Sequence, residues 1–113
     1  MKRSLVIVIC CLIGMVGCAT TSERASDAEK SGNLLEAAKL YERNVDEWLD
    51  KGYNWGHELN KPADIYAKLG KYDEAIRVYK KSISFNSALT GSKSGLQDAR
   101  LGLAKVYVAR GSA

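Results

Sequence analysis

Cysteine, histidine, proline and phenylalanine are scarce in this sequence of 113 residues, and each shortage excludes a class of protein. The three cysteines all lie within the first 18 residues, and histidine, proline and phenylalanine occur once each. Runs of β-branched and aromatic residues at period two, which are typical of strands, are missing outside the N-terminus. Alanine, leucine, lysine and glutamate are abundant, so the sequence predicts an all-α fold.

The same shortages leave little material for catalysis or metal binding. An enzyme needs a nucleophile with a base, or paired carboxylates in a pocket, and the sequence offers neither these nor a glycine-rich phosphate loop. His57 is the single histidine, and it has no companions at the spacing of a metal site. We therefore expect no enzyme activity, no cofactor and no metal.

The charge balance gives no sign of a nucleic-acid partner. The formal net charge of +4 includes Lys2 and Arg3, which lie in a segment that we expect to be removed. The rest of the chain keeps 17 − 2 = 15 basic against 13 acidic side chains, a net charge of +2. Neither a basic arm nor a run of like charge stands out, so no polyanion is indicated.

The first 17 residues have the pattern of an export signal peptide. Two basic residues are followed by a mostly apolar stretch over residues 5–16 and then by a small residue. This stretch would span roughly 18 Å as a helix, well short of a hydrocarbon core of about 30 Å. A permanent membrane span is therefore disfavoured.

Met15, Val16, Gly17 and Cys18 resemble the lipobox of bacterial lipoproteins, in which an aliphatic and a small residue precede glycine and the acylated cysteine. The resemblance implies cleavage before Cys18, a diacylglyceryl thioether on its sulfur and an acyl chain on its new amine. Several acyl chains together give a stable membrane anchor. The other two cysteines would leave with the signal, so no free thiol would remain for redox chemistry.

The residue after the cysteine bears on the compartment. Ala19 rather than aspartate follows Cys18, and the family's sorting rules then imply the outer membrane, facing the periplasm, in a cell with two membranes. One alternative stays open. Gly17, Cys18 and Ala19 also fit a small-x-small site, which would give a secreted protein cleaved after Ala19.

The clearest internal pattern lies between residues 59 and 88. Gly70 would end one helix and Asp73 favours the start of the next, whose apolar residues follow the helical period. These offsets resemble the tetratricopeptide repeat (TPR), a helix-turn-helix unit of about 34 residues in which small residues let two helices pack closely. The matching residues are Leu59, Ala63, Tyr66, Gly70, Tyr72, Ala75 and Tyr79.

Three residues depart from that pattern. Pro62 takes the place of a leucine, and Ser82 and Ser87 replace the usual alanine and proline. Because proline is tolerated only in the first turn of a helix, the helix that carries Pro62 should be short and begin between Glu58 and Lys61.

Weaker copies of the unit lie on both sides. The upstream glycine, Gly32, lies 70 − 32 = 38 residues before Gly70, and the additional residues fit into the connection 51–56. Its matching residues are Gly32, Leu34, Ala37 and Tyr41, with Asn33 and Glu36 as a helix cap. The downstream copy has Leu103, Ala104, Tyr107 and Gly111, after a capping box of Ser94 and Gln97.

Together the matches predict a short, right-handed, TPR-like helical solenoid of about five helices, in which Gly32, Gly70 and Gly111 mark equivalent turns. We divide the chain into a signal peptide (1–17), a lipidated N-terminus with a degenerate first helix (18–31) and a TPR-like repeat domain (32–113). A generic helical bundle is the alternative, since any amphipathic helix pair offers alanine and tyrosine at such spacings.

Proteins with this repeat bind peptides or protein segments along the concave face of their first helices, so the resemblance implies a partner-binding groove here. An ordinary solvated surface is the alternative for each residue. Asp64 stands where a carboxylate clamp needs asparagine, and mixed charges with apolar residues suit an internal segment or an amphipathic helix. The expected groove residues are Asn60, Asp64, Lys68, Leu101, Lys105 and Val108, with Glu29 and Lys30 as an extension.

Tyr53, Trp55 and His57 form an aromatic group in the connection between two units. Tryptophan and tyrosine often anchor interfaces, so Tyr53 and Trp55 are candidate anchors for a partner. The alternative is that the group packs the connection onto the core.

These features predict a lipid-anchored adaptor or assembly factor for an envelope complex. The second hypothesis is a structural envelope protein that associates with copies of itself. About two and a half repeats are fewer than the roughly three that a stable solenoid needs. We therefore expect the end near residues 107–113, or the first repeat, to be covered by another subunit, another protein or the membrane.

Overall fold

The computed structural model describes residues 20–53, 55–88 and 91–112, which form five α-helices and one short 3₁₀ helix. These ranges contain no strand, so the predicted all-α class is confirmed within them. The predicted signal peptide (1–17) and the predicted lipidation site, Cys18, lie outside the described residues. The elements are α2 (Thr21–Lys30), α3 (Leu34–Asp50), the 3₁₀ helix η1 (Gly56–Leu59), α4 (Asn60–Lys68), α5 (Tyr72–Asn86) and α6 (Lys93–Ser112).

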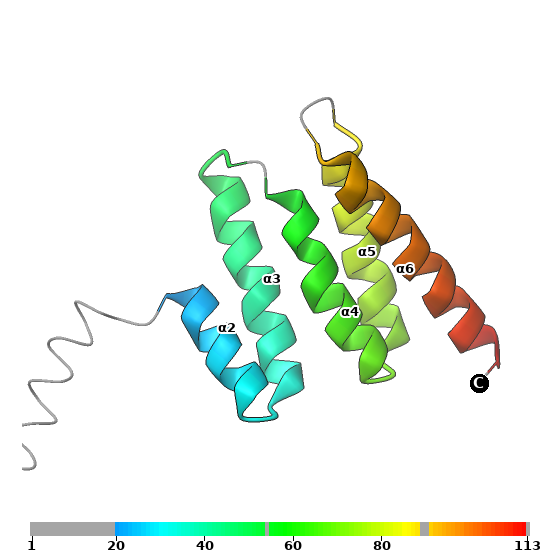
Figure 1. The fold of residues 1–113 in the computed structure, drawn as a ribbon, viewed down its shortest axis with the longest axis horizontal. Coiled ribbons are helices and arrows are strands. Elements are labelled where there is room, and N and C mark those ends of the chain that lie inside the picture. The colour runs from blue at the N-terminus through cyan, green and yellow to red at the C-terminus, as the bar shows by residue number, and fades with distance from the viewer. Residues whose placement is uncertain (1–19, 54, 89–90, 113) are drawn as a thin grey trace, which may run out of the picture.

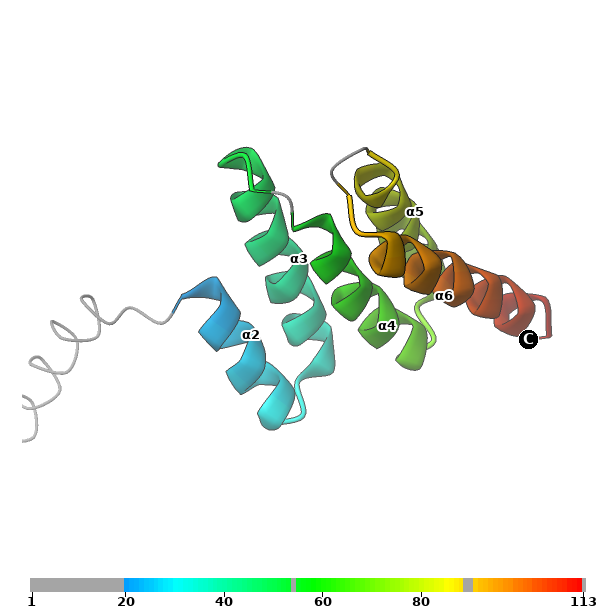
Figure 2. The same cartoon turned by 45° about the horizontal axis from the view of Figure 1, so that its top comes forward.

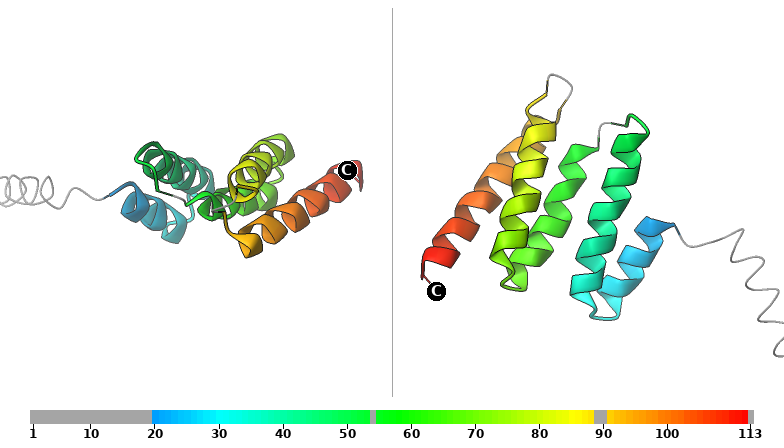
Figure 3. Two further views of the ribbon diagram at one scale, coloured as in Figure 1. Left: turned by 90° about the horizontal axis from the view of Figure 1, so that it is seen from above. Right: turned by 180° about the vertical axis from the view of Figure 1, so that it is seen from behind.

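The helices follow one another side by side, from α2 at one end of the molecule to α6 at the other (Figure 1). Each helix packs against the next in sequence, and α4 also contacts α6. Seen from above, α3 and α5 form one layer, and α2, α4 and α6 form the other (Figure 3). The row that begins with α2 and ends with α6 is also visible after a turn of 45° (Figure 2). None of the helices described here is both long and apolar enough to cross a membrane.

Two of the three predicted turn glycines end helices. Gly32 follows α2 with φ of 85°, and Gly70 follows α4 with φ of 75°, a backbone region that glycine enters without steric cost. The prediction for Gly111 is wrong, because α6 continues through it to Ser112 and its φ is not positive. Glycine adopts negative φ about as readily as positive φ, so a glycine by itself does not end a helix.

The helix starts agree with the sequence at two places and differ at a third. Asn33 caps α3, its side chain accepting a hydrogen bond from the backbone N–H of Glu36 at 3.4 Å. α4 begins at Asn60, inside the predicted window, and Pro62 lies in its first turn. Ser94 was the predicted cap of α6, but Ser92 is the cap, because its Oγ accepts from the N–H of Gly95 at 3.0 Å and α6 already begins at Lys93.

Small residues let the helices approach one another closely. Ala37, Ala63, Ala75 and Ala99 have no exposed surface, and each belongs to a different helix. Tyr66 and Tyr79, at 3% and 2% exposed, fill the spaces that the alanines leave. On the apolar side of α5, Ala75, Ile76 and Tyr79 are buried, whereas Tyr72 and Ile83 are partly buried.

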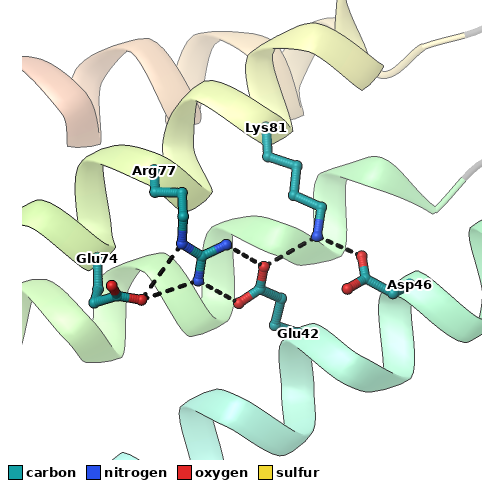
Figure 4. Close-up of polar contacts among 5 residues, drawn as sticks. All are labelled: Glu42, Asp46, Glu74, Arg77 and Lys81. Atoms are coloured by element: carbon teal, nitrogen blue, oxygen red, sulfur yellow. Dashed lines mark hydrogen bonds and ion pairs between the residues drawn. The ribbon is translucent and has the colours of Figure 1, made fainter.

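A group of charged side chains joins α3 to α5 (Figure 4). Arg77 donates to both carboxylate oxygens of Glu42, at 2.7 and 2.8 Å, and Lys81 lies 3.0 Å from one of them. Glu74 also accepts from Arg77, and Asp46 pairs with Lys81. The hydrogen bonds from Arg77 are the main reason why the pKa of Glu42 lies below its ordinary value, although burial opposes them. This buried carboxylate therefore stays ionised at neutral pH.

Candidate partner-binding groove

A groove of about 560 Å³ runs between α4 and α6, with two tyrosines of α5 among its lining residues. Five of the six residues that the sequence suggested lie in it, namely Asn60, Asp64, Lys68, Leu101 and Lys105. Val108 is not among its lining residues and is 70% exposed on α6. The other lining residues are Ala67, Tyr72, Tyr79, Asp98, Gly102, Val106 and Ala109.

Tyr79 connects the floor of the groove to one of its walls. Its hydroxyl donates a hydrogen bond to the carboxylate of Asp64, and its ring lies against Gly102, where an added Cβ would come within 2.4 Å of the ring carbon Cζ. Burial, assisted by the Asp64 carboxylate, raises the pKa of Tyr79, so the phenol keeps its proton and remains a donor. The Asp64 carboxylate therefore already accepts a hydrogen bond from the groove floor before any occupant binds.

Asn60 is held by the fold. Its side-chain amide donates to the carbonyl of Gly95 at 2.9 Å, and its side-chain oxygen accepts from the hydroxyl of Ser82 at 2.7 Å. Ser82 has no exposed surface, and it accepts in turn from Asn86 at 2.9 Å. Asn60 thus ties α4 to both α5 and α6, and its main role is to position the two walls of the groove.

The residues that remain for an occupant combine both charges with apolar surface. Lys68 and Lys105 supply cations from opposite walls, and Asp98 supplies a carboxylate; all three are exposed. Leu101 is 56% exposed at the edge of the groove. Such a surface suits a protein segment that carries apolar side chains with charges of both signs. The ranges described here contain no group of three or more potential metal ligands of the His, Cys, Asp and Glu types.

The suggested extension of the groove, Glu29 and Lys30, is not among its lining residues. Glu29 accepts a hydrogen bond from the hydroxyl of Tyr41 at 2.7 Å and lies 3.5 Å from the ammonium group of Lys61. The hydrogen bond from Tyr41 is the main reason why the pKa of Glu29 is lowered. Glu29 therefore joins α2 to α3 and α4, whereas Lys30 is exposed at the end of α2.

The aromatic group suggested by the sequence is larger than expected. Trp48, at the end of α3, joins it: its ring lies 5.0 Å from that of Tyr53 and 6.1 Å from that of Trp55. Trp55 in turn stacks on His57 at 5.9 Å. Trp48, Tyr53 and Trp55 are 38%, 50% and 45% exposed, so they form a continuous aromatic surface.

Several groove residues were missed by reasoning from the sequence. Asp98, Gly102 and Ala109 were not suggested, although their spacing with Lys105 places them along one side of a helix. Tyr72 and Tyr79 were predicted only as members of the repeat pattern, because a sequence pattern does not distinguish a buried tyrosine from one whose ring forms a groove floor.

Comparison with known proteins found no family model, no curated protein and no solved structure that matches this chain.

Proposed function

We propose that this protein is a lipid-anchored adaptor or assembly factor that holds a segment of another envelope protein in the groove between α4 and α6. The observation that carries the proposal is the groove itself, in which five residues chosen from the sequence lie together. Fold alone would not justify the proposal, because function depends on the site rather than the architecture.

The proposed architecture is a short TPR-like solenoid. Three features support it: the helices lie in a row, Gly32 and Gly70 end α2 and α4 with positive φ, and tyrosines at equivalent positions make similar contacts. Tyr41 of α3 donates to Glu29 of α2, and Tyr79 of α5 donates to Asp64 of α4. The pairs α2–α3 and α4–α5 are thus each joined by a hydrogen bond from a tyrosine to a carboxylate.

The proposed anchor is acylated Cys18, in the outer membrane of a cell that has two membranes. A Cys18→Ser variant tests it by membrane fractionation and by labelling with a radioactive fatty acid. We expect the variant to lose the label and leave the membrane fraction. A variant that keeps the same processing and stays membrane-bound would refute the anchor.

Photo-crosslinking in intact cells tests the groove. A photoreactive amino acid in place of Leu101 should give a crosslinked product with a different protein, which mass spectrometry identifies. The same amino acid in place of Lys39, exposed on α3, is the positional control. Lys68→Glu and Lys105→Glu should each lower the yield at position 101 by about tenfold, because they reverse a charge in the groove wall.

Lys80→Glu is the matched charge control, since Lys80 is exposed on α5 and is not among the groove residues. It should leave the yield at position 101 unchanged. Equal products from positions 101 and 39, or equal losses in all three lysine variants, would show that the groove is not the binding surface.

The outer side of α6 supports a second candidate, a structural protein that associates with copies of itself. In the TPR-like pattern, Ala104 and Tyr107 of α6 correspond to Ala63 and Tyr66 of α4. The α4 pair is buried, at 0% and 3% exposed, and packs in the core together with α5. Ala104 is exposed and Tyr107 is 41% exposed.

Crosslinking from position 104 distinguishes the two functions. A ladder of self-products without foreign proteins favours self-association, whereas a foreign product from position 101 favours the adaptor. Like charge opposes direct pairing of two α6 helices, because Lys93, Arg100, Lys105 and Arg110 outnumber the single acid, Asp98.

A further inference from the structure

The aromatic surface of Trp48, Tyr53 and Trp55 lies beside the beginning of the described chain. Trp48 and Trp55 line a cavity of about 350 Å³ together with Thr20 and Ser22. The hydroxyl of Thr21 donates to the carboxylate of Glu47 at 2.9 Å, which holds the start of α2 against the end of α3. The first described residues and the two tryptophans therefore share one corner of the molecule.

The inference rests on the proposed anchor at Cys18, which would place a lipid close to this corner of the molecule. Cys18 precedes Thr20 by two residues, so their Cα atoms lie at most about 7.6 Å apart, whatever the backbone does. The proposed lipid would then leave the protein next to Trp48 and Trp55. No long linker could hold this corner away from the bilayer.

We propose that Trp48, Tyr53 and Trp55 form a lipid-contacting surface that lies in the headgroup region of the membrane beside the anchor. Tryptophan and tyrosine concentrate at this depth because one part of each ring is apolar and the other can form hydrogen bonds. The three side chains are 38%, 50% and 45% exposed, although rings of this size are usually well buried. Contact with lipid would remove that surface from water.

The charges around the aromatic surface indicate which lipids it can use. Glu47, Asp50 and Glu58 are exposed carboxylates on the neighbouring elements. Two cations lie beside them: Arg43, which is 3.7 Å from Glu47, and Lys51, whose ammonium group is 5.4 Å from the Trp48 ring. Carboxylates do not favour an anionic surface. The contact is therefore aromatic rather than electrostatic, and it should form on zwitterionic lipid and persist in salt.

Such a contact would also set the orientation of the molecule. The aromatic surface belongs to α3 and the connection that follows it, whereas the groove belongs to α4 and α6, and α6 lies at the far end of the row (Figure 1). Two contacts with the bilayer, the lipid and the aromatic surface, restrict rotation about the anchor more than the lipid alone. The groove would then remain open to the periplasm.

The sequence offers a direct test, because Trp48 and Trp55 are its only two tryptophans. The full lipidated chain, purified from membranes, is reconstituted into phosphatidylcholine vesicles, and flotation is measured first. Tryptophan emission is then compared between ordinary vesicles and vesicles with bromine near the headgroup. We expect the shallow bromine to lower the emission about twofold, equally at low and high salt, and bromine at the chain ends to have little effect.

Two variants make the test specific. Tyr53→Ala should weaken the quenching, because it removes an aromatic contact and leaves both fluorophores. Tyr107→Ala, at an exposed tyrosine on α6, should leave it unchanged. A chain that does not float would overturn the anchor and this inference together. A chain that floats but shows no quenching by shallow bromine, or equal effects of the two variants, would overturn the lipid contact while the anchor stands.

Discussion

Arg77 of α5 donates hydrogen bonds to both carboxylate oxygens of Glu42 of α3, at 2.7 and 2.8 Å, across 35 residues of sequence. Glu42 is 8% exposed, whereas the Arg77 side chain is 47% exposed. A buried carboxylate needs such partners, because an ionised group without them is strongly disfavoured. The pair therefore ties the first two helices of the row to the helices that follow.

Arg77→Met should lower the free energy of unfolding by about 1–2 kcal/mol, because Glu42 would keep only Lys81 as a cationic partner and half of Arg77 is already in water. Urea unfolding followed by circular dichroism measures the change. Arg43→Met is the control, since Arg43 is 68% exposed and lies 3.7 Å from Glu47. It should cost at most about 0.5 kcal/mol. Equal losses in the two variants would contradict the assigned role of Arg77.

The same pair should make stability depend on pH. The pKa of Glu42 is lowered from 4.5 in the folded protein, so its pairing contributes fully above that value and is lost as the pH falls through the lower folded pKa. The Tm difference between the native protein and Glu42→Gln should therefore be largest at pH 7 and shrink toward pH 3. Asp98→Asn, at an exposed residue, is the control. A difference that grows on acidification would exclude this linkage.

Two glycines that look alike in the sequence should respond in opposite ways to alanine. Gly70→Ala should destabilise the protein by about 1 kcal/mol, because alanine is strained at φ of 75°. Gly111→Ala should stabilise α6 by a few tenths of a kcal/mol, since alanine favours helix and nothing lies within 4 Å of the added Cβ. Thermal unfolding of both variants measures these effects. A loss at Gly111 as large as that at Gly70 would contradict the assigned difference between the two backbones.

Gly102→Ala should deform the groove. Its Cβ would come within 2.4 Å of the Tyr79 ring, which is only 2% exposed and has little room to move. We expect a loss of about 1–3 kcal/mol from overpacking, together with weaker crosslinking from position 101. Gly111→Ala, on the same helix, controls for the change in helix propensity. Unchanged stability and crosslinking would mean that α6 shifts without affecting the groove.

The groove illustrates how far a pattern of residues can lead. The resemblance to the TPR implied that Asp64, Lys68, Leu101 and Lys105 share a groove, and all four line it. Each pair is also four residues apart, which places its members on one side of a helix. Asn60 was predicted with them because the resemblance to the TPR implies a groove on this helix, yet its side-chain amide is already bonded to Gly95 and Ser82. Helical period identifies a face, but it does not reveal whether a polar side chain on that face already has partners.

The aromatic surface shows a second limit. Tyr53 and Trp55 were predicted as a group because they are close in sequence, whereas Trp48 lies in α3 and was not part of that prediction. The structure joins all three, because the chain turns back after α3 and brings the connection beside the last turn of that helix. The neighbouring residues in the sequence do not predict the direction in which the chain turns after α3.

The helical class, the turns at Gly32 and Gly70 and the small residues of the core could be predicted from the residues alone, because they depend on the conformational freedom of single residues and on the period along one helix. The packed fold was needed to show that Arg77 bonds to Glu42, that Tyr79 bonds to Asp64 and that Gly102 leaves space for the Tyr79 ring. Such contacts join residues far apart in sequence, and they depend on how the helices are rotated and shifted against one another. That arrangement follows from packing the whole core at once.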